Sequence, residues 1–469
     1  MSETSRVRSA AKPLPYIEPR YCKGCGRCIG ACPKHSISFA DRVDPHTGLV
    51  PVAINLETCN GCGLCVAACP EPYGLEGVAS GAERVDPFSL PPPETSPPWP
   101  VPVEAPDEYL PLPERQPLAV KGNHAAAIGA LLAGCRQFYG YPITPSTEGA
   151  ELMARLLPGL GGVFVQAVSE VATINHLYGA AGAGVRAMTF TSSPGFSLML
   201  EGISYLIGAE LPTVVFNVMR GGPGLGNIGP EQSDIKLVCR GLGHGNTHAI
   251  VLAPASPQEM LDLTQLAFEL AFKYRNPVVL AADGYLGQMT GRVELPPYYV
   301  KPGVPAWAVT GDREHRRNLI CSILITEDDL EAHNQRLCAK FARITAAEPR
   351  AELYRTDDAE VLLVACNTPA RMAKGAVEVL RERGIAAGLF RPITLWPFPA
   401  RALDLVVERA RRLVVVEASA GQLEDEVRLA LSHLGRVPPP IESVRRMGGV
   451  LPALEAIVDE VAGAEEVRR

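Results

Sequence analysis

Short apolar runs alternate with helical stretches through the middle of the chain. The helical stretches, such as 171–182 and 256–274, repeat apolar positions at the spacing of one helix face. Because parallel strands need a crossover between them, usually a helix, this alternation predicts a doubly wound α/β sheet. The runs expected to form its buried parallel strands are 163–166, 187–190, 213–219, 249–253 and 277–282.

A second sheet domain is expected to begin near residue 358. A helix that runs through Glu382 should follow its first strand, and another helix should follow its last. Residues 326–356 are charged and carry no strand signal, so they predict a helical connection between the two domains. The strands of the second domain are predicted at 361–365, 387–390 and 413–417.

A stretch dense in proline, from Pro87 to Pro117, precedes the first sheet. Proline has no backbone N–H and fixes its own φ, so this composition disfavours a ladder or a helix and favours extended polyproline geometry. We expect a tether that wraps along the surface of the next domain. A free linker is the alternative.

Composition narrows the class of protein. At 469 residues the chain should hold about three domains. A hydrophobic share of 47% with 20% charged residues is typical of a well-packed soluble protein. The net charge of −7 provides no basic face for nucleic acid. No apolar run approaches the length of about 18 residues that spans a bilayer, so no membrane contact is expected.

Eight of the 13 cysteines fall into two runs near the N-terminus. Each run has three cysteines two residues apart and a fourth before a proline, and the second run repeats the first at an offset of 37 residues, as in an internal duplication. In such runs the fourth cysteine binds the other run's cluster. The predicted sets are Cys22, Cys25, Cys28 and Cys69 for one [4Fe-4S] cluster, and Cys59, Cys62, Cys65 and Cys32 for the second.

Zinc and disulfides explain these runs less well. A zinc site closes with two Cys-x2-Cys pairs and has no use for a third cysteine. Disulfides suit secreted domains, and the polar start of the chain carries no secretion signal. The runs resemble two-cluster ferredoxins, whose oxygen-sensitive clusters favour an anaerobic or microaerobic cytoplasm. The remaining cysteines are expected to be structural: Cys135, Cys239, Cys321, Cys338 and Cys366.

Thr144 lies between two prolines in the segment 140–147, at a predicted junction of strand and helix. Each proline restricts the residue before it to extended geometry, so the loop is stiff. The next helix would offer its free N–H groups to an anion. Taken alone, the motif is explained by simple helix capping.

Glu170 closes a predicted strand and starts a helix. One interpretation is a carboxylate placed against the positive end of the helix dipole. The other is a buried acid that holds a proton on a ring nitrogen of a cofactor.

Arg220 follows a strongly apolar strand and precedes several glycines. This position suits bidentate capture of a carboxylate, although an exposed loop arginine is equally compatible with the pattern. Residues 224–229 match the glycine spacing of a dinucleotide site, but no helix begins on the third glycine, so we reject that site. His244 and His248 lie in a glycine-rich segment that would not align them as a metal pair.

Together these motifs resemble the alpha subunit of the 2-oxoacid:ferredoxin oxidoreductases. The resemblance covers roughly residues 118–465. The segments that carry it are 140–147, Glu170, 191–198, 220–226 and 391–398.

The resemblance implies an α/β fold with a pyrimidine-side thiamine diphosphate domain and a domain like the C-terminal one of transketolase, preceded by a small α+β two-cluster ferredoxin domain. Glu170 matches the glutamate that contacts the aminopyrimidine ring, and Thr144 and Arg220 match residues at the carboxylate end of the substrate. The implied boundaries are 13–85 for the ferredoxin domain, 86–117 for the tether, 118–300 for the thiamine diphosphate domain, 301–357 for a connecting segment and 358–465 for the last domain.

A missing motif determines the expected partners. Thiamine enzymes normally bind Mg²⁺ and the diphosphate through Gly-Asp-Gly followed by an asparagine. The chain has no such sequence, and Asp283 between Ala282 and Gly284 is the nearest fragment. The resemblance therefore implies a beta subunit that supplies this half-site, a gamma subunit, and an external ferredoxin or flavodoxin, with the ferredoxin-like subunit fused to the front of alpha.

The implied reaction is the CoA-dependent oxidative decarboxylation of a 2-oxoacid, with two single electrons passing to the clusters. Residues 220–226 and 286–289 most resemble the branched-chain (2-oxoisovalerate) subgroup. A 2-oxoglutarate enzyme would need a second cation, for which Lys236 or Arg240 could serve; pyruvate is a further alternative. An electron-transfer adaptor without catalysis and an indolepyruvate-type enzyme are weaker readings.

Overall fold

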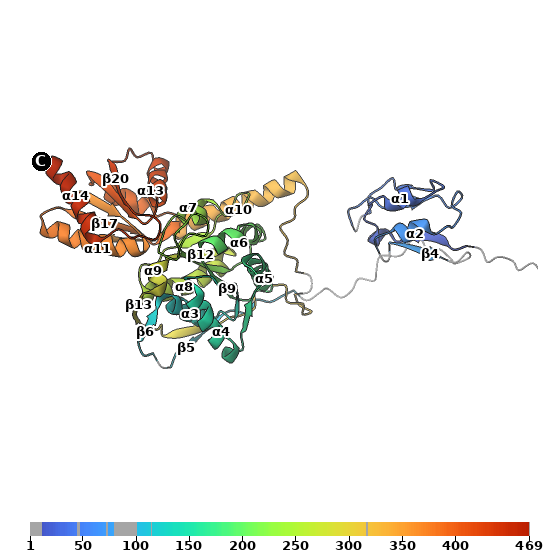
Figure 1. Cartoon of the computed structure of the whole chain (residues 1–469). Coiled ribbons are helices and arrows are strands. Elements are labelled where there is room, and N and C mark those ends of the chain that lie inside the picture. Colours follow the sequence, from blue (N-terminus) through green and yellow to red (C-terminus); the bar gives the residue numbers. More distant parts are fainter. Residues whose placement is uncertain are drawn as a thin grey trace, which may run out of the picture. The chain divides into compact units, whose positions relative to one another are not determined.

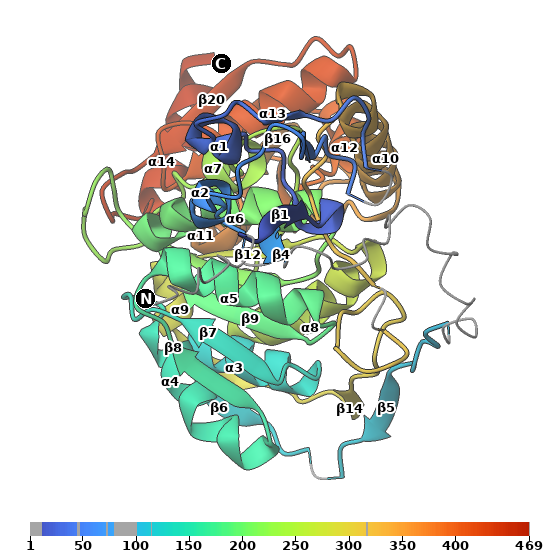
Figure 2. The ribbon, with the colours of Figure 1, turned by 90° about the vertical axis from the view of Figure 1, so that its right-hand side faces the viewer.

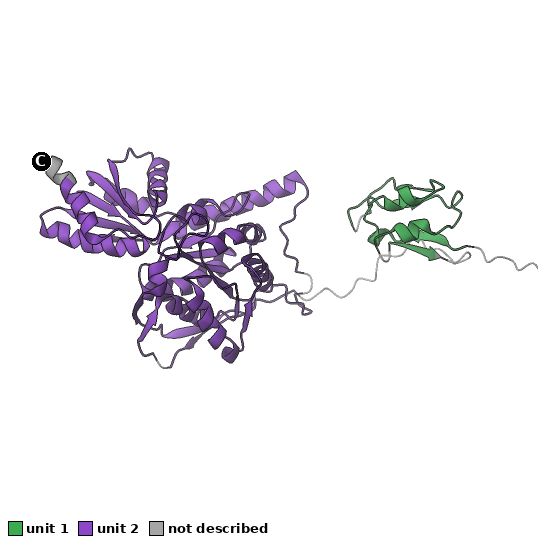
Figure 3. Cartoon of the chain, in the orientation of Figure 1, with its two compact units in different colours: residues 1–99 green, residues 100–469 purple. Residues whose placement is uncertain are grey.

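The computed structural model describes residues 12–44, 47–71, 74–78, 101–113, 115–315 and 318–468. The chain forms two compact units, residues 1–99 and 100–469 (Figure 3). Each unit has its own apolar core among the described residues. The first part of the expected tether, residues 86–100, lies outside the described residues.

The described part of the first unit contains two short α-helices, one 3-10 turn and two antiparallel strand pairs. Each helix follows a glycine in the left-handed conformation and carries the third cysteine of a run, so the two halves repeat one another. Five buried residues form its core, which is small for independent stability. Its elements are β1 (Leu14–Ile17) paired with β4 (Leu75–Val78), β2 (Ile37–Phe39) paired with β3 (Val52–Ile54), η1 (Pro19–Tyr21), α1 (Arg27–Ala31) and α2 (Leu64–Ala68).

The second unit is built on a seven-stranded sheet. Six strands are parallel, and the strand at one edge, β18, is antiparallel to its neighbour. The strands of the middle of the sheet are buried at every residue, as expected where helices cover both faces. In order they are β18 (Thr394–Trp396), β11 (Ile250–Leu252), β12 (Val278–Asp283), β10 (Val214–Met219), β9 (Ala187–Thr191), β7 (Gln137–Gly140) and β8 (Val163–Gln166).

Helices follow the strands of this sheet in the expected alternation. Helix α5 packs across β7 and β9 and lies beside α6, while α3 packs on α8 (Figure 2). The sequence-predicted helices at 171–182 and 256–274 each lie within one residue of the observed bounds. The helices are α3 (Gly122–Leu132), α4 (Thr147–Leu156), η2 (Pro158–Leu160), α5 (Glu170–Gly182), α6 (Ser193–Gly208), α7 (Ile235–Arg240), α8 (Pro257–Tyr274) and α9 (Gly284–Gln288).

Part of the proline-rich segment, residues 108–111, forms a strand, which corrects the expectation from its composition that no ladder would form. β5 (Glu108–Pro111) pairs antiparallel with β14 (Tyr298–Lys301), and β6 (Leu118–Lys121) pairs with β13 (Thr290–Val293). The ladder is possible because a two-stranded edge pairing tolerates a terminal proline, here Pro111.

The C-terminal domain contains a second sheet of five strands. Residues 326–356 include the expected long helix, α10 (Glu327–Ala347), but also a strand, β15 (Ala351–Tyr354), which the sequence did not predict. β15 is a half-buried edge strand, so it lacks the apolar run that marks a central strand. The remaining elements are β17 (Ala387–Pro392), β16 (Val361–Val364), β19 (Arg412–Glu417), β20 (Ile441–Arg445), α11 (Asn367–Glu382), α12 (Ala400–Val407), α13 (Gln422–His433) and α14 (Leu454–Arg468) (Figure 1).

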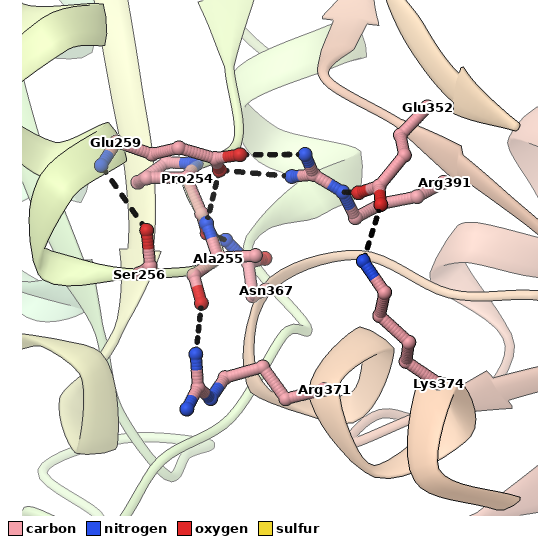
Figure 4. A network of polar contacts seen from close by, with 9 residues as sticks. All are labelled: Pro254, Ala255, Ser256, Glu259, Glu352, Asn367, Arg371, Lys374 and Arg391. Carbon is pink, nitrogen blue, oxygen red and sulfur yellow. Dashed lines mark hydrogen bonds and ion pairs between the residues drawn. The ribbon is translucent and has the colours of Figure 1, made fainter. Parts of the chain in front are cut away.

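An ion-pair cluster centred on Arg391 joins the two sheet domains. The buried guanidinium of Arg391, on β17, binds both carboxylate oxygens of Glu259 on α8, with N···O distances of 2.6 and 2.9 Å. Its Nε binds Glu352 at 2.6 Å, and Lys374 binds the other oxygen of Glu352 (Figure 4). Loss of one partner from a buried ion pair strongly destabilises the fold, because the other charge stays buried without compensation. We therefore expect this cluster to hold the two domains together.

Candidate functional site

The cysteines of the first unit lie in the two predicted groups. Cys32, Cys59, Cys62 and Cys65 line one small cavity. Burial, together with the nearby thiols of Cys22, Cys25 and Cys69, raises the pKa of Cys28 to about 11. Both groups therefore combine three cysteines of one run with the fourth of the other.

Backbone N–H groups point at two of the cysteine sulfurs. Among the described residues, no set of three His, Cys, Asp or Glu side chains has the geometry for one metal ion. The backbone N–H of Val52 points at Cys22 Sγ (3.4 Å), and that of Ser36 points at Cys32 Sγ (3.3 Å). Such N–H groups stabilise ligating thiolates and tune cluster potentials.

The three other predicted residues lie on the side of the main sheet where its parallel strands end. Thr144 follows β7, Glu170 follows β8 and Arg220 follows β10, each at the carboxyl end of its strand. The chain runs from β7 to β8 in one direction and then to β9 on the other side of β7, so the strand order reverses there. Open α/β sheets bind ligands at this kind of switch point.

Polar side chains from other segments bind the loop that carries Thr144, residues 141–146. The Pro145 carbonyl accepts hydrogen bonds from Asn123 Nδ2 (2.7 Å) and Gln288 Nε2 (3.0 Å). Both amides also donate to Glu148, and Lys121 binds that carboxylate at 3.2 Å. Sequence reasoning missed Asn123 and Glu148, because nothing in their local pattern marks them.

Glu170 is buried at the first turn of α5, whose N-cap Ser169 accepts a hydrogen bond from Ala172 N. Its side chain lies against Gly195 in the first turn of α6. A Cβ on Gly195 would stand 2.5 Å from Glu170 Oε1 and 2.4 Å from Thr191 Oγ1. That threonine hydroxyl is buried without a hydrogen-bond partner, and no described residue makes a hydrogen bond to the Glu170 carboxylate.

Arg220 is buried and touches the Thr144 loop directly. Its Nη1 donates to the Thr144 carbonyl at 2.7 Å, and its Nη2 donates to the Leu225 carbonyl at 3.1 Å. Its Nε has no partner, and none of the ion pairs among the described residues includes it. A buried charge bound only by neutral carbonyls favours an anionic ligand.

The first turn of α6 contacts both Arg220 and Glu170. Ser193 is the first residue of α6, and its Oγ accepts a hydrogen bond from Arg220 N at 3.0 Å. Gly195 lies two residues later against Glu170. The structure thus brings the Thr144 carbonyl and Arg220 into contact, and it places Glu170 against α6, the helix whose first residue binds the Arg220 backbone.

Asp283 is not available as a metal ligand. Its buried carboxylate accepts hydrogen bonds from Tyr285 N, Leu286 N and the hydroxyl of Thr368 on one oxygen, and from Thr368 N on the other. These bonds cap α9 and connect it to α11 of the C-terminal domain. The hydrogen bonds of Asp283 therefore give it a structural role.

Comparison with known proteins identifies the family. The profile of a pyruvate flavodoxin/ferredoxin oxidoreductase thiamine diphosphate-binding domain matches residues 128–337, and that of pyruvate:ferredoxin oxidoreductase core domain II matches 359–457. The ketoisovalerate oxidoreductase subunit VorB of Methanothermobacter thermautotrophicus is 50% identical over 349 residues, which cover 73% of this chain and 97% of that protein. This chain belongs to the 2-oxoacid:ferredoxin oxidoreductases.

Other relatives in the family act on different substrates. The 2-oxoglutarate synthase subunit KorA of Archaeoglobus fulgidus is 41% identical over 314 residues, covering 66% of this chain and 90% of that protein. A solved 2-oxoglutarate:ferredoxin oxidoreductase from Magnetococcus marinus superposes with a TM-score of 0.67 at 27% identity, covering 74% of this chain and 65% of that one. A 4Fe-4S dicluster profile matches residues 21–72.

These findings confirm the predicted family and fold class. The oxidoreductase subunit has a thiamine diphosphate-binding domain and a [4Fe-4S] dicluster domain, and it works with partner subunits and ferredoxin. No helix among the described residues is long and apolar enough to cross a bilayer. The roles of individual side chains stay predictions.

Proposed function

We propose that this chain forms the pyrimidine half of a thiamine diphosphate site that decarboxylates branched-chain 2-oxoacids, with 2-oxoisovalerate as the preferred substrate. A beta subunit would supply Mg²⁺ and the diphosphate half, and a gamma subunit would complete the complex. The overall reaction converts the 2-oxoacid and CoA to acyl-CoA, CO₂ and one proton, and delivers two electrons singly to ferredoxin or flavodoxin. When bound, thiamine diphosphate supplies a carbon nucleophile for the 2-oxo carbon.

The buried charge of Arg220 is the observation that carries this proposal. Its guanidinium has a free Nε and no acidic partner among the described residues, so a substrate carboxylate would complete its coordination. The Thr144 hydroxyl stands on the loop whose carbonyl Arg220 already holds. Together they would orient the carboxylate end of a 2-oxoacid.

Glu170 suits the role of holding the proton on the aminopyrimidine ring. Its carboxylate is buried, has no competing hydrogen bond among the described residues, and lies beside the unpartnered hydroxyl of Thr191. Gly195 leaves the space that its side chain occupies. A ring nitrogen next to this carboxylate would find an acceptor that is already oriented.

The loop that carries Arg220 favours an apolar substrate side chain. Leu225 and Ile228 on this loop are 82% and 61% exposed, and one of the two candidate cations for a second carboxylate is already paired. Arg240 binds Glu426 through two hydrogen bonds of 2.9 and 2.6 Å, and Lys236 is exposed on α7. The relative named ketoisovalerate oxidoreductase agrees with this choice.

The test is an anoxic reconstitution with the chain that carries the diphosphate-binding sequence. Ferredoxin reduction would be measured with CoA and 2-oxoisovalerate, 2-oxoglutarate or pyruvate in turn. We expect 2-oxoisovalerate to give the highest kcat/KM, and Glu170→Ala to abolish the rate. A higher kcat/KM for 2-oxoglutarate would refute the substrate assignment, and an unchanged rate in Glu170→Ala would support a non-catalytic adaptor instead.

A further inference from the structure

The loop that follows Arg220, residues 221–229, is hydrogen-bonded to the C-terminal domain. The loop closes on itself at its base, where Gly221 N donates to the Gly229 carbonyl at 2.9 Å. Its tip presents the Leu225 carbonyl to Arg220 Nη2 at 3.1 Å. The position of the guanidinium therefore depends on where this loop lies.

Glu231 bridges the loop and a turn of the C-terminal domain. One oxygen of its buried carboxylate accepts from Gly222 N at 3.1 Å and from Gly448 N at 3.2 Å. Its other oxygen accepts from the hydroxyl of Ser233. A single carboxylate thus satisfies backbone donors from two segments that are more than 200 residues apart in sequence.

The loop and the turn at Gly448 and Gly449 also contact each other directly. Asn227 Nδ2 donates to the Gly448 carbonyl at 2.9 Å. A Cβ on Gly449, which has φ +89°, would lie 2.7 Å from Asn227 Oδ1 and 3.1 Å from Gly229 Cα. Only a glycine allows this approach, since the conformation is left-handed and the neighbours include main chain.

We propose that Glu231 is a positioning residue, through which the turn at Gly448 and Gly449 sets the position of Arg220 for the substrate carboxylate. This inference rests on the proposed function of Arg220. The link continues beyond Glu231, because Gln232 N donates to the Ala418 carbonyl and Gln232 Oε1 accepts from Ala418 N, both within 2.8 Å. The C-terminal domain therefore contributes to substrate binding without touching the substrate.

The experiment compares KM and kcat for 2-oxoisovalerate in the reconstituted complex. Glu231→Ala removes the shared acceptor of the Gly222 and Gly448 N–H groups and should raise KM about tenfold, equivalent to about 1.4 kcal/mol of binding. The effect on kcat should be smaller, since the loss is in substrate binding. Glu231→Gln keeps an oxygen for the two N–H groups and should hold KM within about threefold of the wild type.

A second pair of variants tests the same contact from the C-terminal domain. Gly449→Ala should raise KM about as much as Glu231→Ala, because its Cβ would press on the loop. Gly435→Ala is the matched control. Gly435 has φ +68° in the same domain, so alanine brings similar backbone strain, but nothing lies within 4 Å of its Cβ and KM should not change.

The double variant Arg220→Ala/Glu231→Ala distinguishes the outcomes. If Glu231 acts through Arg220, the KM of the double variant should equal that of Arg220→Ala. Unchanged KM in Glu231→Ala and Gly449→Ala, with raised KM in Arg220→Ala, would overturn the positioning role and leave the proposed function intact. A further tenfold rise in the double variant would overturn it as well. Unchanged KM in Arg220→Ala would refute the carboxylate role itself.

Discussion

Replacing Gly195 by alanine should disable Glu170 without unfolding the protein. The new Cβ would stand 2.5 Å from Glu170 Oε1, whereas ordinary contacts begin at 3.4 Å, so the carboxylate must move by about 0.9 Å. The carboxylate can move because it is the end of a flexible side chain. Thr191 Oγ1, at 2.4 Å, must shift as well.

A displacement of about 1 Å in a catalytic group costs on the order of 10²-fold in rate. We therefore expect Gly195→Ala to lower kcat for 2-oxoisovalerate about 100-fold, in the anoxic ferredoxin-reduction assay with the complete complex. The midpoint of thermal unfolding should fall little, because alanine favours helix α6 by about 0.5–1 kcal/mol, which offsets part of the crowding.

Gly179→Ala provides the matched control for this variant. Gly179 lies on α5, the helix that begins with Glu170, and nothing lies within 4 Å of its Cβ. This substitution should leave kcat unchanged. A Gly195→Ala enzyme with kcat within about threefold of the wild type would refute the reasoning, since the carboxylate position would then not matter.

Three further changes test other parts of the structure. Arg391→Met leaves Glu259 and Glu352 without their buried partner and should lower the free energy of unfolding of the full chain by about 3–5 kcal/mol, measured by denaturant titration. Cys69→Ser should remove about half of the iron after anoxic purification, since each cluster uses one cysteine of the other run. Burial raises the pKa of Glu417, so the folded state loses stability as pH rises from the ordinary carboxyl pKa through the raised one, and Glu417→Gln should flatten that dependence in urea titrations at pH 4–8.

Each of these predictions has a contrary result. An unfolding free energy within about 1 kcal/mol of the wild type in Arg391→Met would mean that the ion-pair cluster does not hold the domains together. Full iron content in Cys69→Ser would reject the exchanged fourth ligand. Stability that rises with pH in the wild type but not in Glu417→Gln would contradict the direction of the Glu417 shift.

The central strands could be predicted because they are buried at every residue. A strand such as β10 needs apolar side chains on both faces, which leaves a continuous run in the sequence. The edge strands β5 and β15 need only one partner and one covered face, so their residues carry no such run. β18 was missed for another reason: it is a three-residue strand whose partner, β11, lies about 140 residues earlier.

Some residues of the candidate site could likewise be predicted from the sequence, and others could not. Glu170, Thr144 and Arg220 stand where strands end, and this position and their chemistry made them visible in the sequence. Glu231 and Asn123 act through backbone groups of distant segments. Their importance depends on tertiary contacts, for which a local pattern carries no signal.

The placement of β18 has a consequence for how this protein could be divided. Residues 394–396 belong by sequence to the region of the second profile, yet they form the outer strand of the sheet that carries Thr144, Glu170 and Arg220. A fragment that stopped after the first profile would leave the β11 edge uncovered, and such an edge invites pairing with other chains. A fragment that is meant to fold alone therefore needs residues 394–396 of the second region.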